Sequence, residues 1–244
     1  PSYLPYVGTS AFAHKGGMHV DAVVKNSQTF EHITPESVGN KSNFLISEVG
    51  GKSAVLSIVN EIDSTITKSS PQLAKILEEL KKLEFKGYIF ETATASLELL
   101  IRRKLCVMTD FFELVDYKLI SEHSTANNMK NSVATVQITS NSQTAIATKS
   151  GDGPVHALDN ALRQAVQNFF PTVKNMHLVD YKVRVIEPQA ASAAMVRVLV
   201  ESTDGETSWT TVGVSKDIIR ASFYAIKDSV LYKLVKDSIT KKNN

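Results

Sequence analysis

The chain has 244 residues, of which 43% are hydrophobic and 21% are charged, and its formal net charge is +2. This is the composition of a globular protein with a core, and the small, dispersed positive charge excludes a typical nucleic-acid-binding protein. The single cysteine excludes an intrachain disulfide and a multi-cysteine metal site, which fits a cytoplasmic protein, and no stretch is apolar enough for a membrane span.

The first 30 residues are chemically the most interesting part of the chain, because two histidines, a lysine and an aspartate surround a glycine pair. His14 and His19 flank the pair Gly16-Gly17, whose lack of side chains lets the backbone approach a ligand closely. The spacing of the two histidines matches neither an HExxH site nor a zinc knuckle, so we expect no metal site in this chain. The residues alone leave open whether these histidines are structural hydrogen-bonding groups or catalytic ones. Because the chain starts with Pro1, we expect it to be part of a longer protein.

Three helices are predicted next. The first covers 53–66 and the second begins at Pro71 and stops before Gly87, because proline suits the first turn of a helix and glycine its end. The third, at 92–104, is apolar on more than one side and is therefore expected to be packed between other elements. We divide this half of the chain into an accessory segment, 1–67, and a helical linker, 68–104.

The C-terminal half, 105–244, contains an internal repeat. The pentapeptide LVDYK occurs at 114–118 and again at 178–182, an offset of 178 − 114 = 64. Each copy is followed by two more strand-like stretches and one helical stretch, so we predict two βββα units packed about a pseudo-twofold axis. The fold class is therefore α+β, with a helical linker region followed by a duplicated βββα domain. The predicted strands cover 111–121, 132–138 and 144–149 in the first copy, and 176–186, 195–202 and 207–214 in the second.

Several motifs occur in a fixed order along the chain. They are SAFAHKGGMHV at 10–20, TFEHITPE at 29–36, GYIFETATAS at 87–96, GDGPVHALDNALR at 151–163 and SWTTVGVSKDIIRAS at 208–222. Together they resemble segments of the isopropylmalate, homocitrate and citramalate synthases, which places the duplicated half as that family's regulatory domain. The last motif is more similar to the citramalate branch than to the leucine branch.

The resemblance implies a transferase, specifically an acyltransferase that condenses acetyl-CoA with a 2-oxo acid. The first hypothesis is pyruvate as the substrate, giving (R)-citramalate in isoleucine biosynthesis. The alternatives are a 2-isopropylmalate synthase of leucine biosynthesis and a non-catalytic, amino-acid-binding dimerisation module. The catalytic TIM barrel of the family does not appear in this chain. We therefore expect the divalent metal in the missing barrel, no cofactor in this chain, and no activity from the chain alone.

The resemblance also implies roles for individual residues. His19 matches the family's catalytic histidine, His14 is a neighbour that orients the loop, and Phe30 stands at a site position where the family usually has tyrosine. The family's end product binds its regulatory domain, so we expect a homodimer that binds a branched-chain amino acid as allosteric effector, isoleucine before leucine.

In the stretch 151–154 we expect a glycine turn, a capping Asp152 and Pro154 within the first helical turn. We expect the effector near the N-termini of the two repeat helices. Backbone N–H groups after Gly151, Asp152, Gly153 and Pro154 can bind its carboxylate, because the first N–H groups of a helix lack partners within the helix. The alternative is that this stretch only starts a helix and that the two aspartates of the repeated pentapeptide are ordinary surface groups. The ammonium of the effector would bind the carboxylate of Asp116 or Asp180. Its branched side chain would fill a small apolar pocket lined by Val155, Ala157, Ile218 and Ala221.

Overall fold

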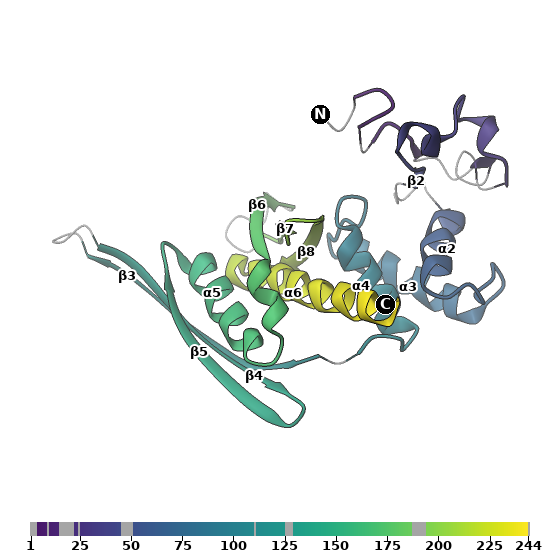
Figure 1. Ribbon diagram of the computed structural model, residues 1–244. Coiled ribbons are helices and arrows are strands. Elements are labelled where there is room, and N and C mark those ends of the chain that lie inside the picture. The colour runs from purple at the N-terminus through teal and green to yellow at the C-terminus, as the bar shows by residue number, and fades with distance from the viewer. Residues whose placement is uncertain are drawn as a thin grey trace. The chain divides into compact units, whose positions relative to one another are not determined.

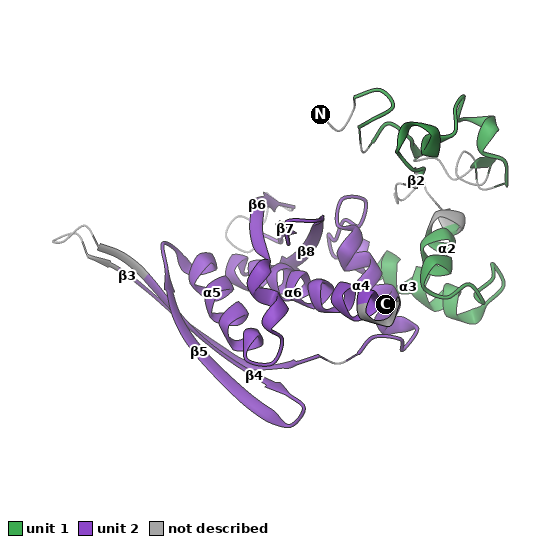
Figure 2. Cartoon of the chain, in the orientation of Figure 1, with its two compact units in different colours: residues 1–82 green, residues 83–244 purple. Residues whose placement is uncertain are grey.

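The computed structural model describes residues 4–8, 10–14, 22–23, 25–44, 51–109, 111–124, 129–186 and 194–243. The chain forms two compact units, residues 1–82 and 83–244 (Figure 2). The division into three segments at 67 and 104 stays a prediction. In the ranges given above, no helix is both long and apolar enough to cross a membrane.

The first unit begins with short elements. Strands β1 (Ala13–His14) and β2 (Asn43–Phe44) form a parallel pair, and the 3-10 helices η1 (Ser27–Thr29) and η2 (Pro35–Val38) lie between them in sequence. Helix η2 ends at Gly39, whose φ of +70° is left-handed and favours glycine. His14, the last residue of β1, thus lies in a strand that pairs with β2, about 30 residues later in the chain.

Two longer helices follow, as predicted. Helix α3 (Pro71–Phe85) starts at the expected proline and buries an apolar stripe, and Gly87 after it has a φ of +97°. Helix α2 (Gly51–Ile62) is shorter than predicted. Its last residue is followed by Asp63, whose carboxylate accepts hydrogen bonds from the backbone N–H and the hydroxyl of Thr65. This local turn competes with helical hydrogen bonds and ends α2 before the expected residue 66.

The second unit contains helix α4 (Thr94–Lys104) and the duplicated half. The side chains of Leu97, Leu99 and Ile101 are fully buried, and α4 packs on both α6 and β8. The prediction of a helix packed between other elements is therefore confirmed.

The duplicated half has the predicted α+β fold, without a TIM barrel in the described residues (Figure 1). Each copy is an antiparallel three-stranded sheet in sequential order followed by a helix, and the short helix η3 (Pro171–Asn175) joins the copies. The first copy comprises β3 (Glu113–Ser124), β4 (Met129–Ser140), β5 (Gln143–Gly151) and α5 (Pro154–Gln167). The second comprises β6 (His177–Val185), β7 (Val196–Thr203), β8 (Ser208–Ser215) and α6 (Ile218–Asn243).

The repeat extends to local irregularities of the backbone. The register of β3 with β4 shifts between Leu114 and Asp116, and that of β6 with β7 shifts between Leu178 and Asp180. In both places the aspartate accepts a hydrogen bond from the N–H of the following tyrosine, at 2.7 Å in the first copy and 2.8 Å in the second. The same pentapeptide thus forms the same β-bulge twice.

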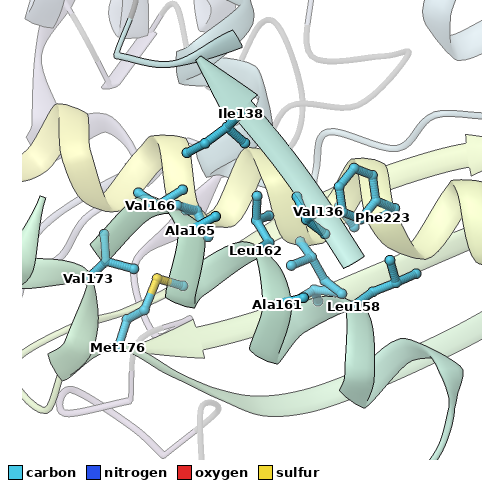
Figure 3. Packing of buried hydrophobic residues seen from close by; sticks show 14 of the residues in the cluster. Val136, Ile138, Leu158, Ala161, Leu162, Ala165, Val166, Val173, Met176 and Phe223 are labelled. Atoms are coloured by element: carbon cyan, nitrogen blue, oxygen red, sulfur yellow. The ribbon is translucent and has the colours of Figure 1, made fainter. Parts of the chain in front are cut away.

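The core of this unit lies between the two sheets. Helix α5 packs on β4 and β5, helix α6 packs on β7 and β8, and the helices also contact each other. Figure 3 shows Val136 and Ile138 of β4 packed with Leu158 and Leu162 of α5 and with Phe223 of α6. One buried cluster therefore joins both copies into a single compact unit.

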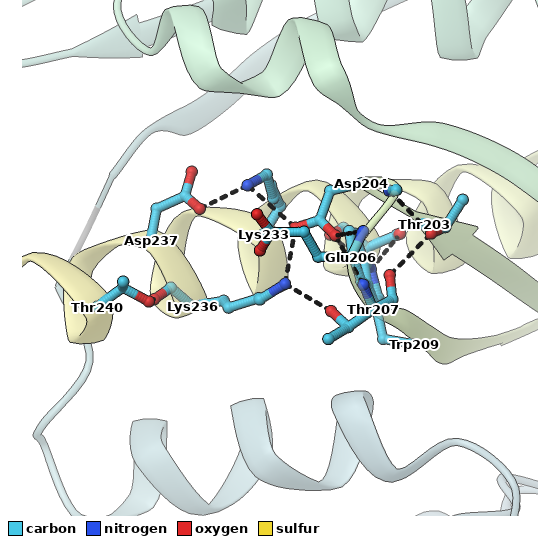
Figure 4. A network of polar contacts seen from close by, with 11 residues as sticks. Thr203, Asp204, Glu206, Thr207, Trp209, Lys233, Lys236, Asp237 and Thr240 are labelled. Carbon is cyan, nitrogen blue, oxygen red and sulfur yellow. Dashed lines mark hydrogen bonds and ion pairs between the residues drawn. The ribbon is translucent and has the colours of Figure 1, made fainter.

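Helix α6 is longer than α5, and its extra turns carry an ionic network (Figure 4). The buried carboxylate of Asp204, in the β7–β8 turn, contacts Lys233 at 3.2 Å and Lys236 at 2.7 Å. Lys233 also contacts Asp237 at 2.5 Å. Burial by itself raises the pKa of Asp204, but hydrogen bonds from the two lysines and from the backbone of Thr207 and Glu206 outweigh it and hold that pKa well below its ordinary value.

Candidate functional site

In the predicted catalytic segment, a buried glutamate contacts a histidine. Nε2 of His14 lies 2.9 Å from Oε1 of Glu31, and the hydroxyl of Ser42 donates to the same oxygen at 2.7 Å. Glu31 is only 4% exposed, and its second oxygen, Oε2, has no hydrogen-bond partner among the described residues. His14 thus joins the end of β1 to the segment before β2. His19 lies outside the described residues.

Phe30, the third residue of this predicted site, is 48% exposed and precedes Glu31 directly. A separate hollow of about 410 Å³ lies in the same unit and is lined by Tyr6, Phe12 and His32, among others. Sequence reasoning did not single out Glu31, although a carboxylate between an aromatic residue and a histidine was visible in the motif at 29–36. Among the described residues, no three histidine, cysteine, aspartate or glutamate side chains lie close enough together to hold a metal ion.

The second predicted site lies where β5 leads into α5. A Cβ atom on Gly151 would lie 2.4 Å from the backbone nitrogen of Ala157, so only glycine permits this close approach. Gly153 is the N-cap residue and Pro154 occupies the first turn. Asp152 was expected to cap the helix, which is wrong: its side chain is fully exposed and lies 3.4 Å from Nδ1 of His156. The cap falls one residue later because Pro154, which lacks an N–H, begins the helix.

A hollow of about 380 Å³ lies beside the N-terminal half of α5 and the start of β6. Val155 and Leu178 give it an apolar wall, and a charged pair from α5 gives it a polar one. Its lining comprises Val155, His156, Asp159, Arg163, His177, Leu178 and Tyr181.

The charged pair of this hollow is Asp159 and Arg163, one helical turn apart. Nε and Nη2 of Arg163 donate to the two carboxylate oxygens of Asp159 at 3.1 and 2.7 Å, and Nη1 donates to the carbonyl of Met176 at 2.9 Å. Burial raises the pKa of the Asp159 carboxyl, although the guanidinium opposes that shift. The sequence analysis did not identify this pair. The only indication in the sequence is that Asp159 and Arg163 are four residues apart, so that they lie on the same face of a helix.

The remaining predicted effector residues lie in different surroundings. Ala157 and Ala221 are fully buried in the core, whereas Ile218 is 45% exposed. Asp116 is exposed, and Asp180 forms an ion pair with Lys182. Of the predicted set, only Val155 lines the hollow beside α5.

Residues 91–234, more than half of the chain, match the LeuA allosteric (dimerisation) domain. The chain belongs to the LeuA allosteric domain family. Residues 6–87 match a second model, the homocitrate synthase post-HMGL domain-like family. The LeuA match therefore covers the first copy, the second copy except the end of α6, and the hollow beside α5, while the second match covers the segment with His14 and Glu31.

Curated relatives agree with the LeuA assignment. The chain is 46% identical to an (R)-citramalate synthase of Aquifex aeolicus, over 97% of the chain and 45% of the relative. It is 43% identical to an (R)-citramalate synthase of Geobacter sulfurreducens, over 95% of the chain and 44% of the relative. A probable 2-isopropylmalate synthase of Methanopyrus kandleri is 28% identical, over 92% of the chain and 43% of the relative. The expected resemblance to these synthases is confirmed, and the chain spans less than half the length of the relatives.

Proposed function

We propose that this chain is the dimerisation and feedback-regulation part of a cytoplasmic acyltransferase that condenses acetyl-CoA with pyruvate to (R)-citramalate in isoleucine biosynthesis. The observation that carries the proposal is the hollow beside α5, which lies inside the segment that matches the LeuA domain. The identity to citramalate synthases supports the choice of substrate.

The hollow supplies what an amino acid with a branched side chain requires. Val155 and Leu178 contact the branch, and the guanidinium of Arg163 and the first backbone N–H groups of α5 attract the carboxylate. The Asp159 carboxylate has lone pairs beyond the two hydrogen bonds from Arg163, and these accept from the ammonium. Asp180 and Asp116 remain the alternative acceptors, on the sequence argument alone. The shape of the pocket would separate isoleucine from leucine by only about 1–3 kcal/mol.

In the longer protein we assign His19 to the catalytic site, with His14 and the buried Glu31 holding its loop and Phe30 beside it. The divalent metal and the substrates would bind in a barrel that precedes this segment. The chain by itself would then be inactive, because proximity to bound substrate supplies much of the rate.

Titration calorimetry with isoleucine, leucine and valine tests the effector site. We expect binding of isoleucine before leucine, and loss of binding in Gly153→Asp, because the new carboxylate repels that of the ligand. A Cβ at Gly153 meets no atom within 4 Å, and aspartate is a favoured N-cap residue, so this variant should fold. Gly153→Ala is the matched control and should bind normally.

Sedimentation of the same sample tests the homodimer, against a monomer of 26.7 kDa. A folded dimer that gives no heat with any of the three amino acids at millimolar concentration would rule out the effector role. A sample that binds but stays monomeric at tens of micromolar would rule out the dimer alone.

A further inference from the structure

A second, larger hollow of about 770 Å³ lies between α6, the start of β3 and the residues that follow α4. Met108, Phe111, Leu114 and Leu231 form its apolar wall, and the side chain of Lys227 lines it from α6. The proposed binding of an amino acid beside α5 does not involve this second hollow.

The position of this hollow follows from the duplication. Leu114 is the equivalent of Leu178 and Lys227 is the equivalent of Arg163, since 178 − 114 and 227 − 163 both equal 64. Each hollow is therefore bounded by the helix of one copy and the first strand of the other. In both, a cationic side chain from the helix stands near a leucine from the strand.

The two hollows differ in the acidic partner of that cation. In the first, Asp159 accepts two hydrogen bonds from Arg163. The equivalent position in the second copy is Phe223, since 223 − 159 = 64, and its buried ring packs on the ring of Tyr117 with a centroid distance of 4.6 Å. Lys227 thus lacks the carboxylate that neutralises Arg163.

The other acidic groups of the second hollow leave Lys227 unpaired. Oδ1 of Asp228 accepts from Arg103 at 2.9 Å, and Oδ2 lies 3.5 Å from the hydroxyl of Ser96. Glu113 is exposed at the rim. Lys227 is intermediate in exposure, and its ammonium has no hydrogen bond or ion pair in the described part of the chain. An unpaired cation beside an apolar wall favours an anion that brings its own apolar surface.

We propose that this second hollow binds a small aliphatic carboxylate without an ammonium group, such as a 2-oxo acid. Lys227 binds the carboxylate, and Met108, Leu114 and Leu231 contact the aliphatic chain. An amino acid is disfavoured because Phe223 stands where the first hollow has Asp159. The acidic groups that remain are Asp228, whose two oxygens already accept from Arg103 and Ser96, and Glu113, which is exposed at the rim. The inference goes beyond the proposed effector function and does not depend on what binds beside α5.

The test compares two ligands with one carbon skeleton, 3-methyl-2-oxopentanoate and isoleucine. The 244-residue chain is labelled at its methyl groups and titrated with each at millimolar concentration, and methyl NMR shifts report the site. We expect the 2-oxo acid to shift the signals of Met108, Leu114 and Leu231, and isoleucine to leave them in place. No shift of these signals in the folded protein, or equal shifts with both ligands, would overturn the proposal, as would 2-oxo acid shifts confined to Val155 and Leu178.

Variants of the cation sharpen the test. Lys227→Met keeps the apolar stem and removes the charge, and should weaken binding of the 2-oxo acid about tenfold or more, as for loss of a hydrogen bond to a charged group. Lys227→Arg should retain binding, and Glu113→Gln should strengthen it by removing a repulsive charge at the rim. Lys118→Met, on an exposed position of β3, is the matched control. Unchanged affinity in a folded Lys227→Met protein would refute the role of the cation.

Discussion

The two βββα copies share strand order, register and a β-bulge, yet their outer faces, away from α5 and α6, differ. On β8, Val212 is only 1% exposed, whereas its equivalent on β5, Thr148, is exposed and the nearby Ile146 is 61% exposed. Helix α4 packs on β8 and accounts for the difference. The two copies therefore share their backbone pattern. The side chains of an outer face are apolar where another element covers that face and include polar ones where it is exposed.

The covering of the second copy is polar as well as apolar. Ser96 of α4 accepts a hydrogen bond from the N–H of Val212 at 3.0 Å, and the guanidinium of Arg197 donates to the carbonyl of Gly87 at 2.5 Å. Strand β8 lies at the edge of its sheet, where backbone N–H groups have no strand to pair with. The segment before the duplicated half thus protects one edge of the second copy.

The largest effect should come from position 223, where the second copy has phenylalanine in place of Asp159 of the first. Phe223→Ala removes a fully buried ring between the sheets and should lower the free energy of unfolding by about 3–5 kcal/mol. Tyr224→Ala removes a neighbouring, 39% exposed ring and is the matched control. Denaturant unfolding of both variants measures the difference. Similar small losses in the two would show that the core does not depend on this aromatic residue.

The next effect concerns the ionic network on the extra turns of α6. Asp204→Asn removes a buried carboxylate that binds Lys233 and Lys236, and should cost about 1.5–3 kcal/mol in the free energy of unfolding at neutral pH. Asp180→Asn, which removes an exposed ion pair with Lys182, should leave the unfolding midpoint unchanged.

The effect of Asp204 also depends on pH, with a definite sign. Its folded-state pKa lies below the unfolded value of about 4, so its contribution is fully present above pH 4 and is lost as the pH falls toward the folded pKa. The difference between wild type and Asp204→Asn should therefore shrink in acid. Burial lowers the pKa of Lys233, but hydrogen bonds to Asp237 and Asp204 raise it overall, so that lysine contributes fully below about pH 10 and loses its contribution at more alkaline pH. A difference that is constant from pH 7 to acid would contradict this assignment.

The features that the sequence predicted correctly depend on residues close together in the chain. Pro71, Pro154 and Gly87 marked helix ends because proline and glycine act on their own backbone, and the repeated pentapeptide revealed the duplication. The early end of α2 was missed because a polar turn at Asp63 prevailed over an apolar stripe that continued to Ile66.

What could not be predicted depends on contacts between distant residues. The buried Glu31 contacts His14 and Ser42, which are distant in sequence, and Asp204 contacts Lys233 on α6. Of the hollow beside α5, the sequence argument found Val155 but not Tyr181, which comes from the other copy. Neither the composition nor the spacing of apolar residues along the chain indicates which distant side chains will meet.

The smallest of these effects should come from the hydrogen bond between α4 and the edge of β8. Ser96→Ala leaves the buried N–H of Val212 without its acceptor, and an unsatisfied buried group costs about 1–3 kcal/mol. The loss should lie near the lower limit, because alanine keeps the helix and a small shift of α4 lets water reach the strand edge. Thr94→Ala, at an exposed position of the same helix, is the control. Hydrogen exchange at Val212 is the sharper measurement: it should accelerate in Ser96→Ala while Val136, inside the first copy, keeps its protection. Equal acceleration at both amides would mean that the variant loosens the whole unit and that α4 does not protect the second copy selectively.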